Sequence, residues 1–359
     1  MSSDFLSIFL PSVLSFIVGI GFTPFWTNYL YKNKMWKKKS GKLDLSGKDT
    51  PIFNELHKDK EVGTPRMGGV VIWFSVLSTA ALLWIISRLV NINFGFDLDY
   101  VSRSQTWIPF ATLILGSLVG LVDDYLEIIG SKDNLAGGLS LKKRLIFVTI
   151  ISLFCAIWFY SKLGIHEIGI PHIGFVDIGV LFVPLFMLVA ILIYSGGVID
   201  GIDGLSGGVF ASIFSAYTGI AFYLGQIHLA TFCATIVGGI LAFLWFNIPP
   251  ARFYMTETGS MGLTITLTIV AFMTDKLGGG YGLIALPVVA MPLIATTLSN
   301  VIQLFSKRFR GKKVFLVAPL HHHFEALGWP AYKVTMRFWV VSIIFAILGM
   351  VIAIASITS

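Results

Sequence analysis

Long apolar runs dominate this sequence and determine its class. An α-helix needs about 20 consecutive apolar residues to cross the hydrocarbon core of a bilayer, and the chain holds about ten such runs. They cover residues 5–31, 67–90, 106–124, 145–163, 178–196, 207–225, 228–246, 260–275, 281–306 and 337–357. The chain is 55% hydrophobic and only 13% charged, against roughly 25% charged residues in soluble domains. The sequence therefore predicts an all-α polytopic membrane protein, with residues 1–359 forming one integral membrane domain.

The basic residues predict the orientation of these spans. Of the 26 Lys and Arg residues, 22 fall in four loops, at 32–66, 125–144, 247–259 and 307–337. By the positive-inside rule these loops are cytoplasmic, and both termini lie on the periplasmic or extracellular side. Because the basic residues follow the loops, the net charge of +7 does not indicate a nucleic-acid partner. The first run has no basic region before it and is long enough to span, so we expect no cleavable signal peptide.

Three features are expected to be structural. Cys155 and Cys233 lie inside apolar runs, which favours packing over a disulfide. Residues 164–179 alternate apolar residues with Gly and Pro, and we expect a small hairpin there on the outer face. His166 and His172 within it are interpreted as ordinary loop histidines.

Acidic and histidine residues gather at the predicted cytoplasmic ends of the spans. Asp123 and Asp124 close the third span, and "DGIDG" after the fifth carries Asp200 and Asp203. The remaining members are Asn247, Arg252 and Glu257 after the seventh span, and His321, His322, His323 and Glu325 in the last cytoplasmic loop. The orientation was assigned from Lys and Arg alone, so this clustering on one face is an independent observation.

A carboxylate is costly inside a bilayer, and less so near the interface. Five acids at span ends therefore predict a shared polar cavity that holds a cation. Mg²⁺ prefers oxygen ligands and bridges to substrate phosphates while keeping several waters. A few carboxylates with basic neighbours fit Mg²⁺ better than an all-protein calcium site.

Each motif alone also has a structural interpretation. Interfacial aspartates can cap helices, "DGIDG" can be a turn stabilised by Asp side chains, and three consecutive histidines cannot all point one way. The segment "GTPRMGG" (63–69) can be a tight entry into the second span, or its helix start can face an anion. The four groups of polar residues lie on one predicted face of the membrane, and together they favour a functional site.

The motifs together resemble a known family. "TPRMGG", "DDY", "DGIDGL", "FN", "GS" and "PLHHHFEALGWP" followed by "RFW" occur in the order and spacing of the phospho-N-acetylmuramoyl-pentapeptide transferases, along nearly the whole chain. The resemblance implies transfer of phospho-MurNAc-pentapeptide from UDP-MurNAc-pentapeptide to undecaprenyl phosphate, giving lipid I and UMP with Mg²⁺. It also implies a multi-pass protein of the bacterial inner membrane, in contact with the lipid bilayer, and a homodimer.

The resemblance also implies roles for individual residues. Asp123 and Asp124 match the aspartate pair near the lipid phosphate, and we expect Asp123 to deprotonate or orient it. Asp200 matches a residue of the nucleotide and metal region, with Asp203 as its partner. The other matches are Asn247 and Tyr254 at the uridine site, His321, His322 and His323 near the diphosphate, Thr64, Arg66 and Arg144 as substrate contacts, and Glu257 as a metal ligand.

Several positions depart from the family pattern. The metal-binding aspartate is Glu257 here, an asparagine before "DGIDG" is Gly197, and the third residue of "TPTMGG" is Arg66. A lysine is replaced by Glu61 beside Lys60, and another by Arg144.

These departures leave alternatives open. The nearest is the same chemistry with UDP-N-acetylglucosamine as donor, against which the "HHH…GWP" segment argues. A catalytically silent relative is disfavoured by the four intact aspartates. A secondary transporter is disfavoured because the acids lie at span ends and the sequence shows no internal repeat.

Overall fold

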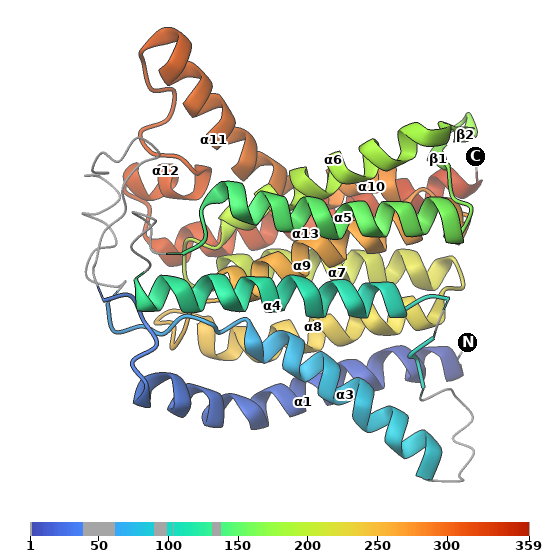
Figure 1. Ribbon diagram of the computed structural model, residues 1–359, viewed down its shortest axis with the longest axis horizontal. Coiled ribbons are helices and arrows are strands. Elements are labelled where there is room, and N and C mark those ends of the chain that lie inside the picture. Colours follow the sequence, from blue (N-terminus) through green and yellow to red (C-terminus); the bar gives the residue numbers. More distant parts are fainter. Residues whose placement is uncertain (1, 39–61, 90–98, 103, 131–137, 359) are drawn as a thin grey trace.

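The computed structural model describes residues 2–38, 62–89, 99–102, 104–130 and 138–358 of the chain. The long helices are α1 (Ser2–Lys32), α3 (Val70–Leu89), α4 (Trp107–Ile129), α5 (Leu141–Lys162), α6 (Phe182–Ser195), α7 (Leu205–Tyr223), α8 (Ile227–Asn247), α9 (Thr256–Met273), α11 (Met291–Arg310) and α13 (Ala331–Thr358). Shorter elements are the strands β1 (Glu167–Ile170) and β2 (Gly174–Asp177), the helices α10 (Gly282–Val289) and α12 (Leu320–Ala326), and the 3₁₀ turns η1 (Gly179–Leu181), η2 (Gly196–Ile199) and η3 (Lys276–Gly278). The long helices lie side by side in one bundle (Figure 1).

Each of the ten predicted apolar runs forms helix, so the prediction of an all-α polytopic membrane protein is confirmed. Among the described residues, seven helices are long and apolar enough to cross a membrane, or eight if the bent pair α10–α11 is one span. The helices α4 and α9 are not among them; α4 carries three acids, and α9 carries Glu257 and several threonines. The number of crossings and their orientation therefore stay predictions.

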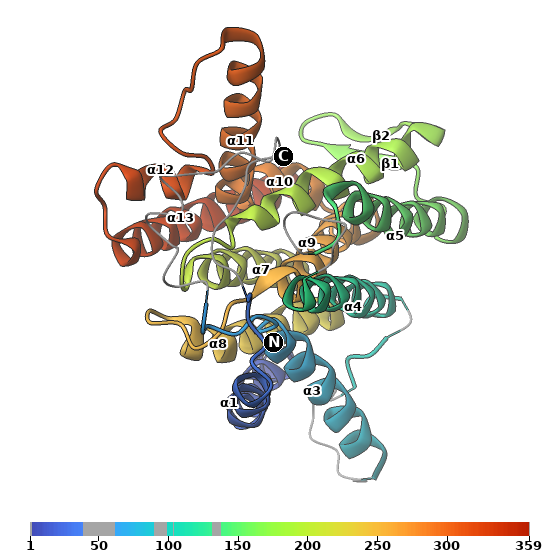
Figure 2. The same ribbon diagram turned by 60° about the vertical axis from the view of Figure 1, so that its left-hand side comes forward.

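The ninth predicted span differs from the expectation of one continuous helix. It is broken at Ala290 into α10 and α11, whose axes are bent by 64°. Pro292 stands in the first turn of α11, where a residue without a backbone N–H is tolerated at a helix start but not in its interior. The bend carries the far end of α11 away from the bundle, as both views show (Figures 1 and 2).

Helix α9 forms the centre of the bundle, and glycines bring α4 close to it. All α9 residues except Glu257 are buried. A Cβ atom at Gly120 of α4 would lie 2.1 Å from the carbonyl oxygen of Glu257, and one at Gly116 would lie 2.9 Å from the Cα of Gly262. Small residues allow such close backbone contact between membrane helices. This contact places the last turns of α4 against the first turn of α9.

The expected hairpin is present at the end of the bundle that holds both termini. Strands β1 and β2 pair antiparallel, with Ile168 opposite Val176. The N- and C-termini lie at this end, and α12 lies at the opposite end (Figure 1). Cys155 and Cys233 are free and buried, as predicted. The two ends of the bundle thus differ in the way that the sequence predicts, with the polar motifs gathered opposite the termini.

Candidate active site

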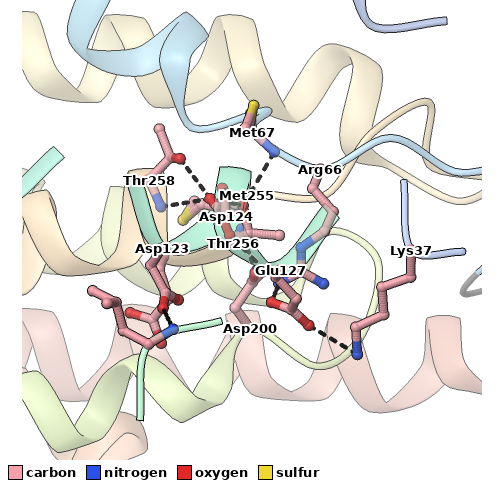
Figure 3. Close-up of polar contacts among 12 residues, drawn as sticks. Lys37, Arg66, Met67, Asp123, Asp124, Glu127, Asp200, Met255, Thr256 and Thr258 are labelled. Atoms are coloured by element: carbon pink, nitrogen blue, oxygen red, sulfur yellow. Dashed lines mark hydrogen bonds and ion pairs between the residues drawn. The ribbon is translucent and has the colours of Figure 1, made fainter. Parts of the chain in front are cut away.

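The polar motifs meet where α4 ends and α9 begins (Figure 3). Asp123 and Asp124 are both 0% exposed, although the sequence predicted them at the very end of a span. They lie inside α4, which continues to Ile129. Both aspartates therefore lie before the C-terminal end of α4, where they face α9 instead of water.

Asp124 is held by two threonines of α9. Its Oδ2 atom accepts hydrogen bonds from the hydroxyl groups of Thr256 and Thr258 and from the Thr258 backbone N–H at 2.9 Å. Its Oδ1 atom lies 3.5 Å from Nη2 of Arg66. A carboxylate can be buried only when hydrogen bonds and opposite charge replace its lost hydration, and Asp124 has both.

Asp123 is less fully satisfied than its neighbour. Its Oδ1 atom accepts a hydrogen bond from the Leu139 N–H and lies 3.7 Å from Nε of Arg144. Its Oδ2 atom is buried and has no hydrogen-bond partner among the described residues. An unpaired buried carboxylate oxygen is costly, so Oδ2 is an atom with capacity for a proton, a metal ion or a substrate group.

Glu257 stands in the first turn of α9 and pairs with Arg144 of α5. The Arg144 guanidinium donates through Nη1 to Glu257 Oε1 and through Nε to the Leu139 carbonyl oxygen at 3.1 Å. Arg144 therefore contacts one of the two oxygens of Glu257 and also faces Asp123. The sequence predicted Arg144 as a substrate contact, and here it lies between two of the acids.

Asp200 is joined to the same centre through Thr256. It follows η2, and its two oxygens accept hydrogen bonds from the Ser206 hydroxyl and the Thr256 N–H, both at 2.7 Å. The departure at Gly197 lies one turn earlier. A Cβ atom there would make ordinary contact with Ser260 at 3.4 Å, so a larger residue would have little room but no clash at Cβ.

Asn247 and Asp203 hold the "DGIDG" loop in place. Asn247 Oδ1 accepts from the Gly204 N–H at 2.9 Å, and its Nδ2 donates to the Phe253 carbonyl oxygen at 2.8 Å. Asp203 Oδ2 accepts from the Ala251 N–H at 3.2 Å. Through these hydrogen bonds, the two side chains join the "DGIDG" loop to the backbone of residues 251–253.

The "RFW" motif supports the same loop from α13. Trp339 Nε1 donates to the Gly204 carbonyl oxygen at 3.0 Å, and Thr335 donates to the Asp203 carbonyl oxygen at 3.1 Å. The guanidinium carbon of Arg337 lies 4.0 Å from the centre of the Trp329 ring, a cation–π distance. The "RFW" motif thus has a structural role beside the site.

The three histidines lie in and around α12 with different environments. His321 and His322 are buried, and His322 Nδ1 lies 2.7 Å from Glu325 Oε2. His323 Nδ1 accepts from the Leu316 N–H at 3.2 Å. A Cβ atom at Gly201 would lie 2.5 Å from Nε2 of His321 and 2.8 Å from Nε2 of His322. Glycine at 201 therefore lets two of the histidines contact the aspartate loop.

The segment after residue 62 closes the site from the side of α3. The Tyr254 N–H donates to the Pro65 carbonyl oxygen at 2.9 Å, and the Gly68 N–H donates to the Tyr254 carbonyl oxygen at 2.8 Å. Tyr254 and Thr64 are partly buried. Arg66 reaches the acids of α4, whereas Glu61 and Lys60 lie outside the described residues.

Sequence reasoning missed Glu127, Thr256 and Thr258. Glu127 lies three residues after Asp124 on the same face of α4, and it was missed because the predicted span ended at 124. Acidic oxygens of Asp123, Asp124 and Glu127 all lie within 4.8 Å of one another. Thr256 and Thr258 carry no charge, so only the fold shows that they bind Asp124.

The donor set suits one hard divalent cation. Asp123, Asp124, Glu127, Asp200 and Glu257 carry five carboxylates, against three nearby basic side chains, Lys37, Arg66 and Arg144. This excess of negative charge and the unpartnered Oδ2 of Asp123 fit an ion that prefers oxygen ligands, as Mg²⁺ does.

The ends of α4 and α9 thus form a centre of buried aspartates with neighbouring arginines in a bundle of apolar helices. Residues 106–275 match the glycosyl transferase family 4 profile, so fold and site define a phosphoglycosyl transferase of the membrane. A phospho-N-acetylmuramoyl-pentapeptide-transferase from Anoxybacillus flavithermus is 31% identical over 96% of this chain and 97% of its own. Others from Chloroflexus aggregans (30%, over 98% of this chain and 90% of its own) and Dichelobacter nodosus (33%, over 81% and 80%) are similar. The chain therefore belongs to the phospho-N-acetylmuramoyl-pentapeptide-transferase family.

Proposed function

We propose that this protein transfers phospho-MurNAc-pentapeptide from UDP-MurNAc-pentapeptide to undecaprenyl phosphate, forming lipid I and UMP in peptidoglycan biosynthesis. An oxygen of the acceptor phosphate attacks the phosphorus that carries the sugar. A new P–O bond forms, the bond from that phosphorus to the bridging oxygen breaks, and UMP leaves with that oxygen.

The observation that carries this proposal is the buried acid and arginine centre at one end of an apolar bundle. A lipid phosphate stays at the membrane surface while its tail remains in hydrocarbon, and a nucleotide sugar arrives from water. A reaction between them needs a charged centre at that boundary, and the ends of α4 and α9 supply one. The names of relatives that match along nearly the whole chain support phospho-N-acetylmuramoyl-pentapeptide as the transferred group.

Asp123 is the residue proposed to act on the acceptor. A phosphate monoester has a second pKa of about 6 and is largely dianionic at neutral pH. The free Oδ2 of Asp123 accepts the remaining proton from the monoanionic form and orients the attacking oxygen. Asp124, fixed by Thr256 and Thr258, supports this geometry from the next position of the helix.

The rest of the centre binds and neutralises the diphosphate. Glu257 and Asp200 would hold Mg²⁺, which supplies Lewis-acid stabilisation of the diphosphate oxygens when bound. Arg144 contributes a fixed positive charge between Glu257 and Asp123. Positioning and charge stabilisation of this kind account for most of the catalysis of phosphoryl transfer.

The flanking residues are proposed to bind the donor. His321, His322 and His323 contact the diphosphate or sugar, and Tyr254 stacks on the uracil ring as aromatic side chains can. Asn247 and Asp203 shape the uridine site by fixing residues 251–253 and Gly204. Thr64 contributes a hydroxyl group at the entrance.

The membrane arrangement belongs to the same proposal. We propose a single domain with about ten crossings in the bacterial inner membrane, both termini outside and the site on the cytoplasmic face. Two copies form a homodimer. Cysteine accessibility at introduced positions near residue 310 and in the β1–β2 hairpin tests the orientation, since only the hairpin should react from outside.

The direct test is UMP release by the purified protein in detergent with undecaprenyl phosphate. UDP-MurNAc-pentapeptide and UDP-GlcNAc are compared as donors, each with Mg²⁺ and with EDTA. We expect release only with the MurNAc donor and only with the metal. Release only with UDP-GlcNAc would assign the protein to the sister activity. No release with either donor from folded protein would refute the transferase and favour a silent relative.

A further inference from the structure

The three carboxylates of the α4 cluster, Asp123, Asp124 and Glu127, lie too close together to remain charged without a cation. Their oxygens lie within 4.8 Å of one another, and both aspartates are fully buried. Like charges at that separation repel strongly in a medium of low dielectric constant. Either a metal ion or a basic side chain of the protein must supply the compensating positive charge.

Arg66 already stands among these carboxylates. Its Nη2 atom lies 2.6 Å from Glu127 Oε2 and 3.5 Å from Asp124 Oδ1, so one guanidinium nitrogen serves both acids (Figure 3). Lys37 contacts the other Glu127 oxygen at 2.9 Å. Burial lowers the pKa of Arg66, but the neighbouring carboxylates, with Glu127 contributing most, together raise it above its usual value, so the guanidinium keeps its charge in the cluster.

The backbone around Arg66 is fixed on both sides. Its N–H donates to the Met35 carbonyl oxygen at 2.8 Å, and the Met67 N–H donates to the Thr256 hydroxyl oxygen at 3.2 Å. Together with the ion pairs to Glu127 and Asp124, these backbone contacts position the side chain in advance, so it loses little entropy when it binds a ligand. A surface arginine would lack this support.

Arg66 also keeps one donor unused. Its Nε atom is buried and has no hydrogen-bond partner in the part of the chain that the structure describes. A buried N–H without an acceptor is costly, and a guanidinium edge is well shaped for phosphate oxygens. The same guanidinium contacts Asp124, and the adjacent residue of α4, Asp123, has the unpartnered Oδ2.

We propose that Arg66 is the resident cation of the α4 cluster, filling the position that a divalent ion would otherwise take between Asp124 and Glu127, and that it binds the phosphate of the lipid acceptor directly. The contact with the lipid acceptor rests on the proposed function, whereas the assignment of Arg66 as the resident cation does not. Mg²⁺ then belongs to the Glu257 and Asp200 side of the centre. The chain supplies the positive charge on the acceptor side itself.

Cation binding without substrate tests whether Arg66 is the resident cation. Mn²⁺ binding is measured by electron paramagnetic resonance on the wild type, R66T, R66Q, R66K and R66T/E127Q. We expect R66T and R66Q to bind one Mn²⁺ per chain more than the wild type, and R66K and the double variant to show no gain. In the same variants, Mg²⁺ should raise the melting temperature of R66T more than that of the wild type, because a ligand stabilises the state that binds it.

Equal Mn²⁺ stoichiometry in the wild type, R66T and R66Q would overturn the resident-cation assignment. If R66T is unstable without metal, recovery of its melting temperature by Mg²⁺ supports the assignment, and absence of recovery counts against it. These readouts need no turnover, so they remain decisive even if neither nucleotide sugar is a donor.

Steady-state kinetics test whether Arg66 binds the phosphate of the lipid acceptor. R66T should raise the KM for undecaprenyl phosphate at least tenfold and leave the KM for the nucleotide sugar within twofold. R66K should fall between R66T and the wild type, because a lysine keeps the charge but loses the planar fork. A change in the nucleotide-sugar KM alone would overturn the acceptor contact.

Discussion

Thr256 binds Asp124 through its hydroxyl group across a separation of 132 residues in the sequence. The same residue donates its backbone N–H to Asp200 at 2.7 Å, so two aspartates from different motifs are fixed by one threonine. Thr256 has a φ of +57°, which is rare for a β-branched residue. Such strain persists only where surrounding contacts impose it, and it clusters at functional sites.

Removing the Thr256 hydroxyl should therefore disturb the positions of both Asp124 and Asp200. Thr256→Val keeps the shape and the strained backbone but removes the hydrogen bond to Asp124, a loss of about 1.5–3 kcal/mol for a charged acceptor. We expect kcat/KM for UMP release to fall at least about tenfold, since each 1.4 kcal/mol is a factor of about ten. Thr256→Ser keeps the hydroxyl and should retain most activity. Equal losses in the two variants would show that the methyl group matters instead.

The approach of α4 to α9 should be sensitive to a single methyl group. In Gly120→Ala the new Cβ would lie 2.1 Å from the Glu257 carbonyl oxygen, so the helices must move apart and carry Asp123 and Asp124 with them. We expect a lower melting temperature and at least about tenfold less activity, because overpacking typically costs about 1–3 kcal/mol. The matched control is Gly21→Ala in α1, where a Cβ meets nothing within 4 Å. That change should be neutral or stabilising, and a loss of activity there would undermine the comparison.

The sequence predicted the membrane class and the gathering of Asp123, Asp124, Asp200 and Glu257 in one site, because both depend on residue type. Apolar length identified ten helical runs, and the acids could be grouped by their place after the spans. The bend between α10 and α11 was missed because the run 281–306 was identified by its hydropathy, and hydropathy does not register where the backbone changes direction.

The contacts within the site could not be predicted from the sequence, because they depend on helix packing. Glu127 became visible only when α4 was seen to continue past Asp124. The pairing of Glu257 with Arg144 joins two helices that are far apart in the sequence. Arg66 was noticed as a departure from the family pattern, and the fold shows what it contacts.

The charge of Glu257 should set the metal requirement of the reaction. Glu257→Gln removes a proposed ligand and also leaves Asp123 as the only acid, among the described residues, that forms an ion pair with Arg144. We expect the Mg²⁺ concentration for half-maximal UMP release to rise at least about tenfold, within the range seen when supporting groups of a metal site are lost. Glu257→Asp keeps a carboxylate and should stay closer to the wild type. An unchanged Mg²⁺ dependence in Glu257→Gln would place the metal away from this residue.

A buried carboxyl group at the other end of the bundle should make stability depend on pH. Asp275 lies two residues beyond α9, is 2% exposed, and accepts a hydrogen bond from the Gly169 N–H of the hairpin at 2.9 Å. Burial raises its pKa to about 7, although backbone hydrogen bonds from Gly169, Leu283 and Lys276 lower it. The folded state therefore binds more protons than the unfolded state between pH 4 and 7, so the free energy of unfolding falls as pH rises through this window.

Asp275→Asn should remove this pH dependence while keeping an oxygen that can accept from Gly169. At pH 5 the variant and the wild type should melt within about 1 °C of each other, whereas at pH 8 the variant should melt higher, by on the order of 2 °C. Intrinsic tryptophan fluorescence during thermal unfolding in detergent measures both. Asp177→Asn, at an exposed position of the same hairpin, is the control and should show no such pH-dependent gain. A variant that is less stable than the wild type at pH 8 would mean that the ionised carboxylate is the form that holds the hairpin to α9.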